Sequence, residues 1–257
     1  MDGLYGRPQA DLPPAVVGHF EACERCRRIY RWVLDPEPSA EIAPETTEQV
    51  ATRLCSSLEP VKPLPSTWVI ATRFFCILLG LAGLLLLYLG VDGVRNMALP
   101  QLLIVGGILG FAAVFLSVSL SWQIVPGHSQ RIPAPMLIAA FLAGFALVVA
   151  ALFPWEGGAQ LLGSGWGCTT HGLAMALPMG IILLYLASRG APLSYGTLGA
   201  SLGAVSGLLG LTVLQFSCDN QHAGHLILWH GAVVVICVAS GYLFGRLAHY
   251  IAIRRLN

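Results

Sequence analysis

The first residues that could carry out chemistry lie near the amino terminus, where the sequence reads HFEACERC from His19 to Cys26. On a helix at about 100° per residue, positions 0, 4 and 7 lie within about 60° of one another, so His19, Cys23 and Cys26 share one face. One imidazole and two thiolates suit tetrahedral zinc, and a fourth ligand would complete a structural site. The H-x3-C-x2-C spacing therefore predicts a metal or thiol site.

The fourth ligand of this site stays open. Residues 1–18 contain neither histidine nor cysteine, which leaves Asp11, Cys55 or a water molecule. Three ligands bind a metal more weakly than four, and two cytosolic thiols could instead be oxidised. The motif is thus compatible with a zinc role, a redox role or a packing role without chemistry.

Two short helices are expected to position the motif. Basic and apolar residues interleave over residues 27–33, which predicts an amphipathic helix that stops at Asp35-Pro36. A second helix is expected over Glu45–Leu58, and the prolines between and after these helices make stiff linkers. Because two small helices bury little core alone, residues 1–66 are predicted to be a head that binds a partner.

Charge and hydrophobicity change near Ser66. The chain is 56% hydrophobic and 11% charged, yet 17 of its 27 charged residues precede residue 67. This composition excludes an ordinary soluble globule, and the net charge of +1 argues against direct nucleic-acid binding. The amino terminus has no basic flank before an apolar core, so we expect no cleavable signal peptide and a cytosolic head.

Six apolar stretches follow the head, each suited to cross about 30 Å of hydrocarbon as a helix. We expect them at Phe74–Val91, Leu99–Trp122, Met136–Phe153, Leu173–Ala187, Thr197–Phe216 and Ile227–Leu247. Turn-forming or polar segments separate them, among them 92–96, 156–171 and 217–225. The predicted fold is all-α, a polytopic membrane domain over residues 67–257 with about six transmembrane helices and a small helical cytosolic head.

The distribution of arginine agrees with six spans and with both termini in the cytoplasm. Arginine is enriched on the cytosolic side of membrane proteins. With the head inside, Arg95 alone falls outside, while the cytosolic side holds Arg73, Arg131, Arg189, Arg246, Arg254 and Arg255. With five or seven spans, the arginines would no longer be concentrated on the cytosolic side.

This topology gathers five possible ligands on the outer face. They are Cys168 and His171 at the entrance of the fourth span, and Cys218, His222 and His225 before the sixth. Two outward cysteines in an oxidising compartment can form a disulfide, and cysteines with imidazoles can bind zinc or copper. A sensory site, a permanent disulfide and two unrelated cysteines all remain open. His230 follows Trp229 at the membrane entry and is interpreted as an interfacial anchor.

The residue types within the spans indicate close helix packing and argue against ion-coupled transport. Gly199, Gly203 and Gly207 lie on one stripe of the fifth span, where another helix backbone can approach closely. No span carries the midplane charges that an ion-coupled transporter usually needs.

No nucleophile, base and orienting acid converge, so we do not expect an enzyme. The alternative function is a membrane transporter or metal-handling protein whose head senses a metal.

The amino-terminal motif resembles that of the zinc-binding anti-sigma factors of bacteria, which carry H-x3-C-x2-C in a short cytosolic head before a membrane segment. The resemblance implies that His19, Cys23 and Cys26 are zinc ligands. It also implies that the flanking helices occlude the RNA-polymerase-binding faces of an extracytoplasmic-function sigma factor.

The membrane part is independently similar to the six-span negative regulators of sigma factors of NrsF type. The similarity covers roughly residues 60–255 and is carried by WGC at 166–168, ASRGAP at 187–192, SCD at 217–219 and LWH at 228–230. It implies oxidant or metal stress as the input, with Cys168 and Cys218 as its carriers. Together the two resemblances predict a bacterial inner-membrane anti-sigma factor that sequesters an extracytoplasmic-function sigma factor and releases it under stress.

Overall fold

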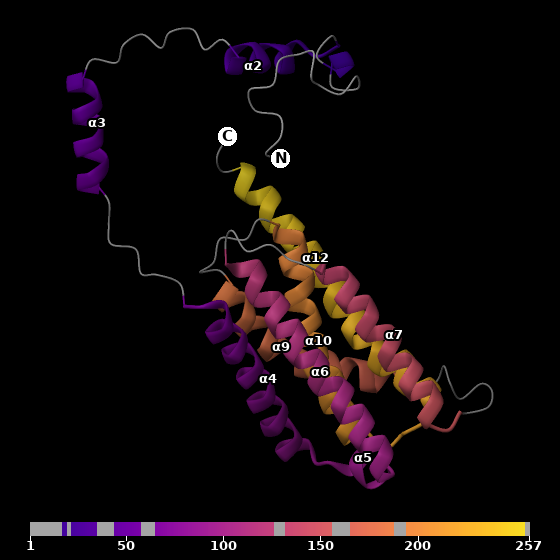
Figure 1. Ribbon diagram of the computed structural model, residues 1–257. Coiled ribbons are helices and arrows are strands. Elements are labelled where there is room, and N and C mark those ends of the chain that lie inside the picture. The colour runs from indigo at the N-terminus through magenta and orange to yellow at the C-terminus, as the bar shows by residue number, and fades with distance from the viewer. Residues whose placement is uncertain are drawn as a thin grey trace. The chain divides into compact units, whose positions relative to one another are not determined.

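The computed structural model describes residues 17–19, 22–34, 44–57, 65–125, 132–155, 165–187 and 194–254. Within these ranges the regular elements are all helices and none is a strand (Figure 1). The predicted all-α fold is therefore confirmed. The chain divides into two compact units, Met1–Lys62 and Pro63–Asn257.

The described part of the first unit includes α2 over Glu24–Leu34 and α3 over Pro44–Ser57. α2 ends directly before Asp35-Pro36, because proline disfavours a helical conformation in the residue that precedes it. α3 lies within one residue of its predicted bounds at each end. Val50 and Leu54, one turn apart on α3, are 50% and 60% exposed. This helix therefore exposes two apolar side chains on one face.

The second unit holds six helices that are long and apolar enough to span a membrane. They are α4 (Thr67–Leu89), α6 (Leu99–Ile124), α7 (Ala134–Leu152), α9 (Trp166–Ala187), α10 (Tyr195–Ser217) and a last span over Ala223–Ile251. The last span combines α11 (Ala223–His225), the π-helix η2 (Leu226–His230) and most of α12 (Gly231–Arg254). Successive spans run in opposite directions (Figure 1), so the predicted number of spans is confirmed.

Several helix ends differ from the predicted ones. α4 begins at Thr67 rather than Phe74, and the short helix α5 (Asp92–Arg95) occupies a segment predicted to be a turn. α9 begins at Trp166 rather than Leu173, so the predicted loop 156–171 is helical from residue 166. Hydropathy detects only the apolar part of a helix, whereas backbone hydrogen bonds such as that from the Thr169 amide to the Gly165 carbonyl oxygen, at 3.1 Å, continue it beyond that part. In α9, Thr170 Oγ1 donates to the Gly167 carbonyl oxygen at 2.8 Å.

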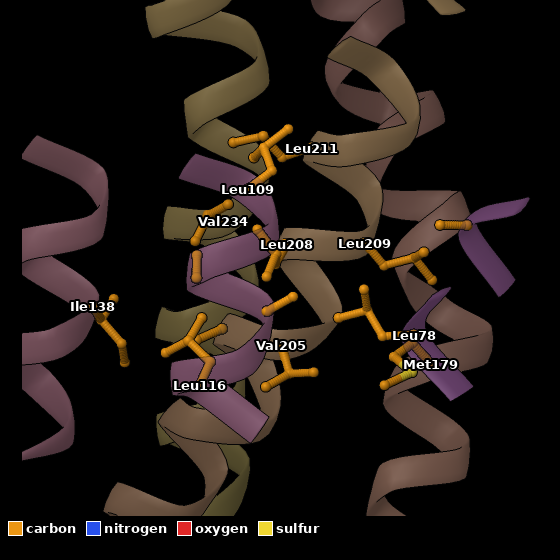
Figure 2. Packing of buried hydrophobic residues seen from close by; sticks show 14 of the residues in the cluster. Leu78, Leu109, Leu116, Ile138, Met179, Val205, Leu208, Leu209, Leu211 and Val234 are labelled. Carbon is orange, nitrogen blue, oxygen red and sulfur yellow. The ribbon is translucent and has the colours of Figure 1, made fainter. Parts of the chain in front are cut away.

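Helix α10 forms the centre of the six-helix bundle. In its most apolar window 89% of the residues are buried, against 17–39% in the other five spans. Leu208, Leu209 and Leu211 on α10 are each fully buried. Figure 2 shows them among side chains of the surrounding helices, including Leu109 and Val234. The other five spans keep broad apolar faces exposed, as expected for helices that contact lipid.

Small residues allow α10 and α12 to pack at backbone distance. A Cβ atom added at Gly203 would overlap the carbonyl oxygen of Cys237, and one added at Gly199 would overlap that of Gly241. At Gly207 an added Cβ would lie 2.7 Å from the Cα of Val234. The predicted packing role of this glycine stripe is confirmed, because only glycine lets the two backbones approach so closely.

Candidate metal and thiol sites

The predicted donors of the head lie together. His19 Nε2 lies 3.3 Å from Cys26 Sγ, and one donor atom from each of His19, Cys23 and Cys26 lies within 4.8 Å of the others. Cys23 itself precedes the first residue of α2, yet its amide donates to the His19 carbonyl oxygen at 2.8 Å and its own carbonyl accepts from Arg27 at 3.1 Å. These bonds span four residues each and keep the helical spacing that unites the three side chains.

The two head thiols have different acidities. The pKa of Cys23 is lowered, chiefly because the backbone amide and the thiol of Cys26 donate hydrogen bonds to it. The pKa of Cys26 is raised, because its thiol proton is engaged by Cys23. Two cysteine sulfurs and an imidazole provide three of the four donors of a tetrahedral zinc site. Among the residues that the structure describes, no fourth donor joins them, and the candidate Asp11 lies outside those residues.

A second group of donors gathers at the end of the bundle where α9 begins and α10 ends. We call it the bundle cluster; it comprises Cys168, Cys218, His225 and His230, whose donor atoms all lie within 4.8 Å of one another. Cys168 Sγ lies 3.8 Å from Cys218 Sγ, and Cys218 Sγ lies 3.7 Å from His225 Nε2. The rings of His225 and His230 meet edge to face, with centroids 5.2 Å apart.

The π-helix explains how two histidines five residues apart come to face the same thiols. In a regular α-helix such positions point about 140° apart. In η2 the Gly231 amide donates to the Leu226 carbonyl oxygen, five residues back. This wider turn aligns residues five apart, and Thr169 Oγ1 of α9 donates to the Trp229 carbonyl oxygen within it at 2.9 Å. Such π-turns occur frequently at functional sites.

His230 is the least expected member of the bundle cluster. Its side chain is fully buried, and neither ring nitrogen has a hydrogen-bond partner. The sequence predicted an interfacial anchor, which is wrong because η2 turns the ring inward. A buried polar group without a partner is costly, and His230 has two such atoms on one ring.

Two of the five donors predicted for the outer face do not join the bundle cluster. His171 is exposed, and its Nδ1 lies 2.7 Å from the Gly167 carbonyl oxygen of its own helix. His222 Nδ1 lies 2.9 Å from Asn220 Oδ1. The structure therefore brings together Cys168, Cys218 and His225 from the predicted set and adds His230.

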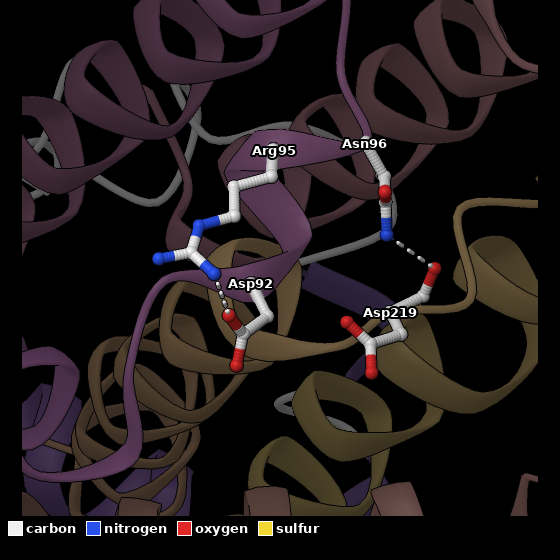
Figure 3. Close-up of polar contacts among 4 residues, drawn as sticks. All are labelled: Asp92, Arg95, Asn96 and Asp219. Atoms are coloured by element: carbon white, nitrogen blue, oxygen red, sulfur yellow. Dashed lines mark hydrogen bonds and ion pairs between the residues drawn. The ribbon is translucent and has the colours of Figure 1, made fainter.

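The segment that carries Cys218 is held by its neighbours on the same end of the bundle. Asn96 Nδ2 donates to the Asp219 carbonyl oxygen at 3.2 Å (Figure 3), and Gln221 Nε2 donates to the Cys218 carbonyl oxygen at 2.7 Å. A Cβ at Gly93 of α5 would lie 2.7 Å from that same carbonyl oxygen. The Arg95–Asp92 ion pair, at 3.2 Å, lies within the exposed face of α5 (Figure 3). This support fixes the position of the Cys218 thiol.

The environment of Cys218 also changes its acidity. The hydrogen bond that its thiol makes with Cys168 raises the pKa of Cys218, and partial burial raises it further. The two sulfur atoms lie 3.8 Å apart, close enough for a metal ion or an oxidant to engage both thiols.

One comparison with known proteins finds a family. The family model NrsF, described as negative regulator of sigma F, matches residues 54–249. The chain belongs to the NrsF family. No curated protein and no solved structure matches it. The NrsF match runs from the end of α3 through all six spans and includes every member of the bundle cluster, whereas His19, Cys23 and Cys26 precede it.

Membership of the NrsF family confirms the resemblance seen in the membrane part and makes this chain a negative regulator of a sigma factor. That role points to regulation by binding rather than to catalysis. The six apolar helices over the matched region are compatible with a multi-pass membrane protein.

Proposed function

We propose that this chain is an anti-sigma factor of a bacterial inner membrane that sequesters an extracytoplasmic-function sigma factor through residues 1–66. It releases the sigma factor when oxidant or metal stress modifies the opposite side of the membrane. The observation that carries the proposal is the NrsF match over all six spans. Both termini lie in the cytoplasm, and residues 67–257 act as the receiving domain.

The first unit supports a binding role. α3 exposes Val50 and Leu54 one turn apart, and an apolar helical face of this kind binds a groove or a helix of a partner. The head donors His19, Cys23 and Cys26 hold a zinc ion that stiffens this unit, with the fourth position taken by Asp11, Cys55 or water. Zinc supplies folding free energy in small domains of this type.

The charges at the two ends of the bundle support the proposed orientation. Arg73, Arg246 and Arg254 lie toward the end at which α4 starts and α12 finishes, which is the cytosolic end under the positive-inside bias. At the end that holds the bundle cluster, Arg95 is paired with Asp92 at 3.2 Å. Cys168 and Cys218 then lie close to the outer surface, where stress agents arrive first.

The input acts on Cys168 and Cys218. A metal ion binds both sulfur atoms as thiolates and displaces their protons. An oxidant joins them into one disulfide, and accepts the two electrons and two protons that the thiols lose. Either event favours one of two packings of α9, α10 and the last span that differ in their affinity for the sigma factor, so the signal is a shift in population.

Co-purification tests the proposal. The full chain is expressed with the extracytoplasmic-function sigma factors of the source genome, and the membrane-bound complex is treated with diamide or with cadmium. The untreated chain should retain one sigma factor and the treated chain should release it. Cys168→Ser with Cys218→Ser should retain the sigma factor under treatment, whereas Cys76→Ser, outside the bundle cluster, should behave like the parent.

The two parts of the proposal fail separately. Retention of no sigma factor by any form of the chain would contradict anti-sigma activity of this kind. Equal release from the parent and from the double serine variant would leave anti-sigma activity standing and exclude these two cysteines as the input.

A further inference from the structure

We propose that Cys168, Cys218, His225 and His230 form a closed tetrahedral site for one thiophilic divalent metal ion of the zinc class. The sequence predicted neither this set of four nor the participation of His230. The role of this ion as a regulatory input rests on the proposed function, whereas its binding does not.

The distances between the donors match those that zinc requires. Zinc–sulfur bonds of about 2.3 Å and zinc–nitrogen bonds of about 2.0–2.1 Å at tetrahedral angles place two sulfurs about 3.8 Å apart and a sulfur and a nitrogen about 3.6 Å apart. Cys168 Sγ and Cys218 Sγ are 3.8 Å apart, and Cys218 Sγ and His225 Nε2 are 3.7 Å apart. These two distances match edges of a zinc tetrahedron, and all four donor atoms lie within 4.8 Å of one another.

A site formed by the two thiols alone would not explain the position of His230. Its ring is fully buried, and both ring nitrogens lack a hydrogen-bond partner. A disulfide between Cys168 and Cys218 would use only two of the four side chains and leave this imidazole unpaired. A metal ion would use all four and give a His230 nitrogen the partner that burial demands.

The backbone is shaped to build this site. The π-turn of η2 brings His225 and His230 to one side, and such turns occur frequently at functional sites. Thr169 Oγ1 supports the turn through the Trp229 carbonyl oxygen. The neighbouring His171 and His222 bond to Gly167 and Asn220 instead. The ligand set is therefore these four residues.

A bound ion would tie three elements together. Cys168 lies in the first turn of α9, Cys218 directly follows α10, and the two histidines flank and end η2. Occupancy would thus fix the position of α9 and of the last span relative to the central helix. This gives the receiving domain a two-state element that a metal ion can set.

Cobalt binding tests the site without any sigma factor. The full chain is purified in detergent with reductant and freed of metal, in a background of His19→Ala, Cys23→Ser and Cys26→Ser that removes the head donors. We expect one cobalt ion per chain, with thiolate charge-transfer absorption and the intense visible bands of tetrahedral cobalt. Single replacements of Cys168 or Cys218 by serine, or of His225 or His230 by alanine, should weaken binding more than about 100-fold.

Two matched controls and one direct measurement keep this test decisive. His171→Ala and His222→Ala, at the same end of the bundle, should bind cobalt like the parent. X-ray absorption of the zinc-loaded parent, which needs no change at the site, should give two sulfur neighbours at about 2.3 Å and two nitrogen neighbours at about 2.0 Å.

The proposal is overturned if the parent binds no cobalt, if X-ray absorption gives no sulfur neighbours, or if loss of His225 and His230 leaves the affinity unchanged. Because no sigma factor is present in these measurements, none of these outcomes bears on anti-sigma activity. Conversely, absence of a captured sigma factor would leave the metal site intact.

Discussion

The head and the bundle hold similar donors in opposite ways. His19, Cys23 and Cys26 come from one short segment and lie at exposed or half-buried positions. The bundle cluster draws its four donors from three elements, and both of its histidines are buried. The metal proposed for the head would therefore organise its donors. The bundle is organised by helix packing, so its donors are positioned before a metal arrives.

This difference suggests separate roles for the two groups. Loss of the proposed metal from the head should loosen the unit proposed to bind the sigma factor, because two short helices bury little apolar core. Loss of metal from the bundle should leave the six helices assembled, because the fully buried side chains around α10 hold them together. The predictions below separate the two groups, in order of decreasing effect.

The largest effect is expected from Gly203→Leu. The added side chain would overlap the Cys237 carbonyl oxygen, which is backbone and cannot rotate away. Overpacking of this severity should lower the free energy of unfolding of the bundle by about 3 kcal/mol. The bundle cluster should then lose cobalt, whereas the head should retain it. Cobalt absorption is measured separately for each group, in one variant without the head donors and in another without the donors of the bundle cluster.

Gly106→Leu is the matched control, because nothing lies within 4 Å of an added Cβ at Gly106 of α6. Equal destabilisation by the two substitutions would contradict the account of α10–α12 packing.

His230→Leu should stabilise the metal-free bundle. Both unpartnered ring nitrogens disappear from a fully buried position, which should raise the free energy of unfolding by about 1–2 kcal/mol. In the presence of zinc the order should reverse, since the variant lacks a ligand. Denaturant unfolding with and without zinc measures both. His19→Leu is the control: it lies at an exposed position of the head and should leave unfolding of the bundle unchanged. A loss of stability in His230→Leu that is the same with and without zinc would argue against the site.

Asn96→Ala should weaken the support of the Cys218 segment. It removes the hydrogen bond to the Asp219 carbonyl oxygen, and should cost about 1 kcal/mol of unfolding free energy. Arg95→Ala removes an ion pair whose side chains are 79% and 52% exposed, and should change stability by less than about 0.5 kcal/mol. Thermal unfolding of both variants compares the two contacts directly. A larger loss of stability in Arg95→Ala than in Asn96→Ala would mean that the ion pair, and not the Asn96 hydrogen bond, stabilises this end of the bundle.

The smallest effect concerns the two head thiols. Because hydrogen bonds from Cys26 lower the pKa of Cys23, while the pKa of Cys26 is raised, Cys23 should become reactive at a lower pH. Alkylation of the metal-free chain across a pH series, read at each cysteine by mass spectrometry, should show the Cys23 profile rising first. Coincident profiles would mean that the two thiols do not interact.

Patterns local in sequence predicted much of this molecule. Hydropathy gave all six spans, because a membrane helix needs a continuous apolar stretch, and the H-x3-C-x2-C spacing predicted the proximity of His19 and Cys26. The start of α9 was missed, since Gly167, Thr169, Thr170 and His171 interrupt the apolar pattern while the backbone hydrogen bonds continue, as from Thr169 to Gly165.

The bundle cluster could be predicted only in part. Alternating spans place Cys168 and Cys218 at one end of the bundle, but they do not say which histidines face them. His171 and His222 have polar partners of their own, and His230 turns inward only because η2 departs from the regular helix. No sequence periodicity marks a π-turn, and its presence depends on contacts such as that between Thr169 and Trp229.

Binding of the sigma factor to the full chain in lipid nanodiscs is the most direct test of the central claim. We predict a one-to-one complex with the partner sigma factor, which Leu54→Asp should weaken by at least about 10-fold, since it places a charge on the apolar face of α3. Gly106→Leu, in the bundle, should leave the affinity unchanged. No binding by chain whose six helices are folded, or equal binding by Leu54→Asp, would contradict the claim that the first unit holds the sigma factor.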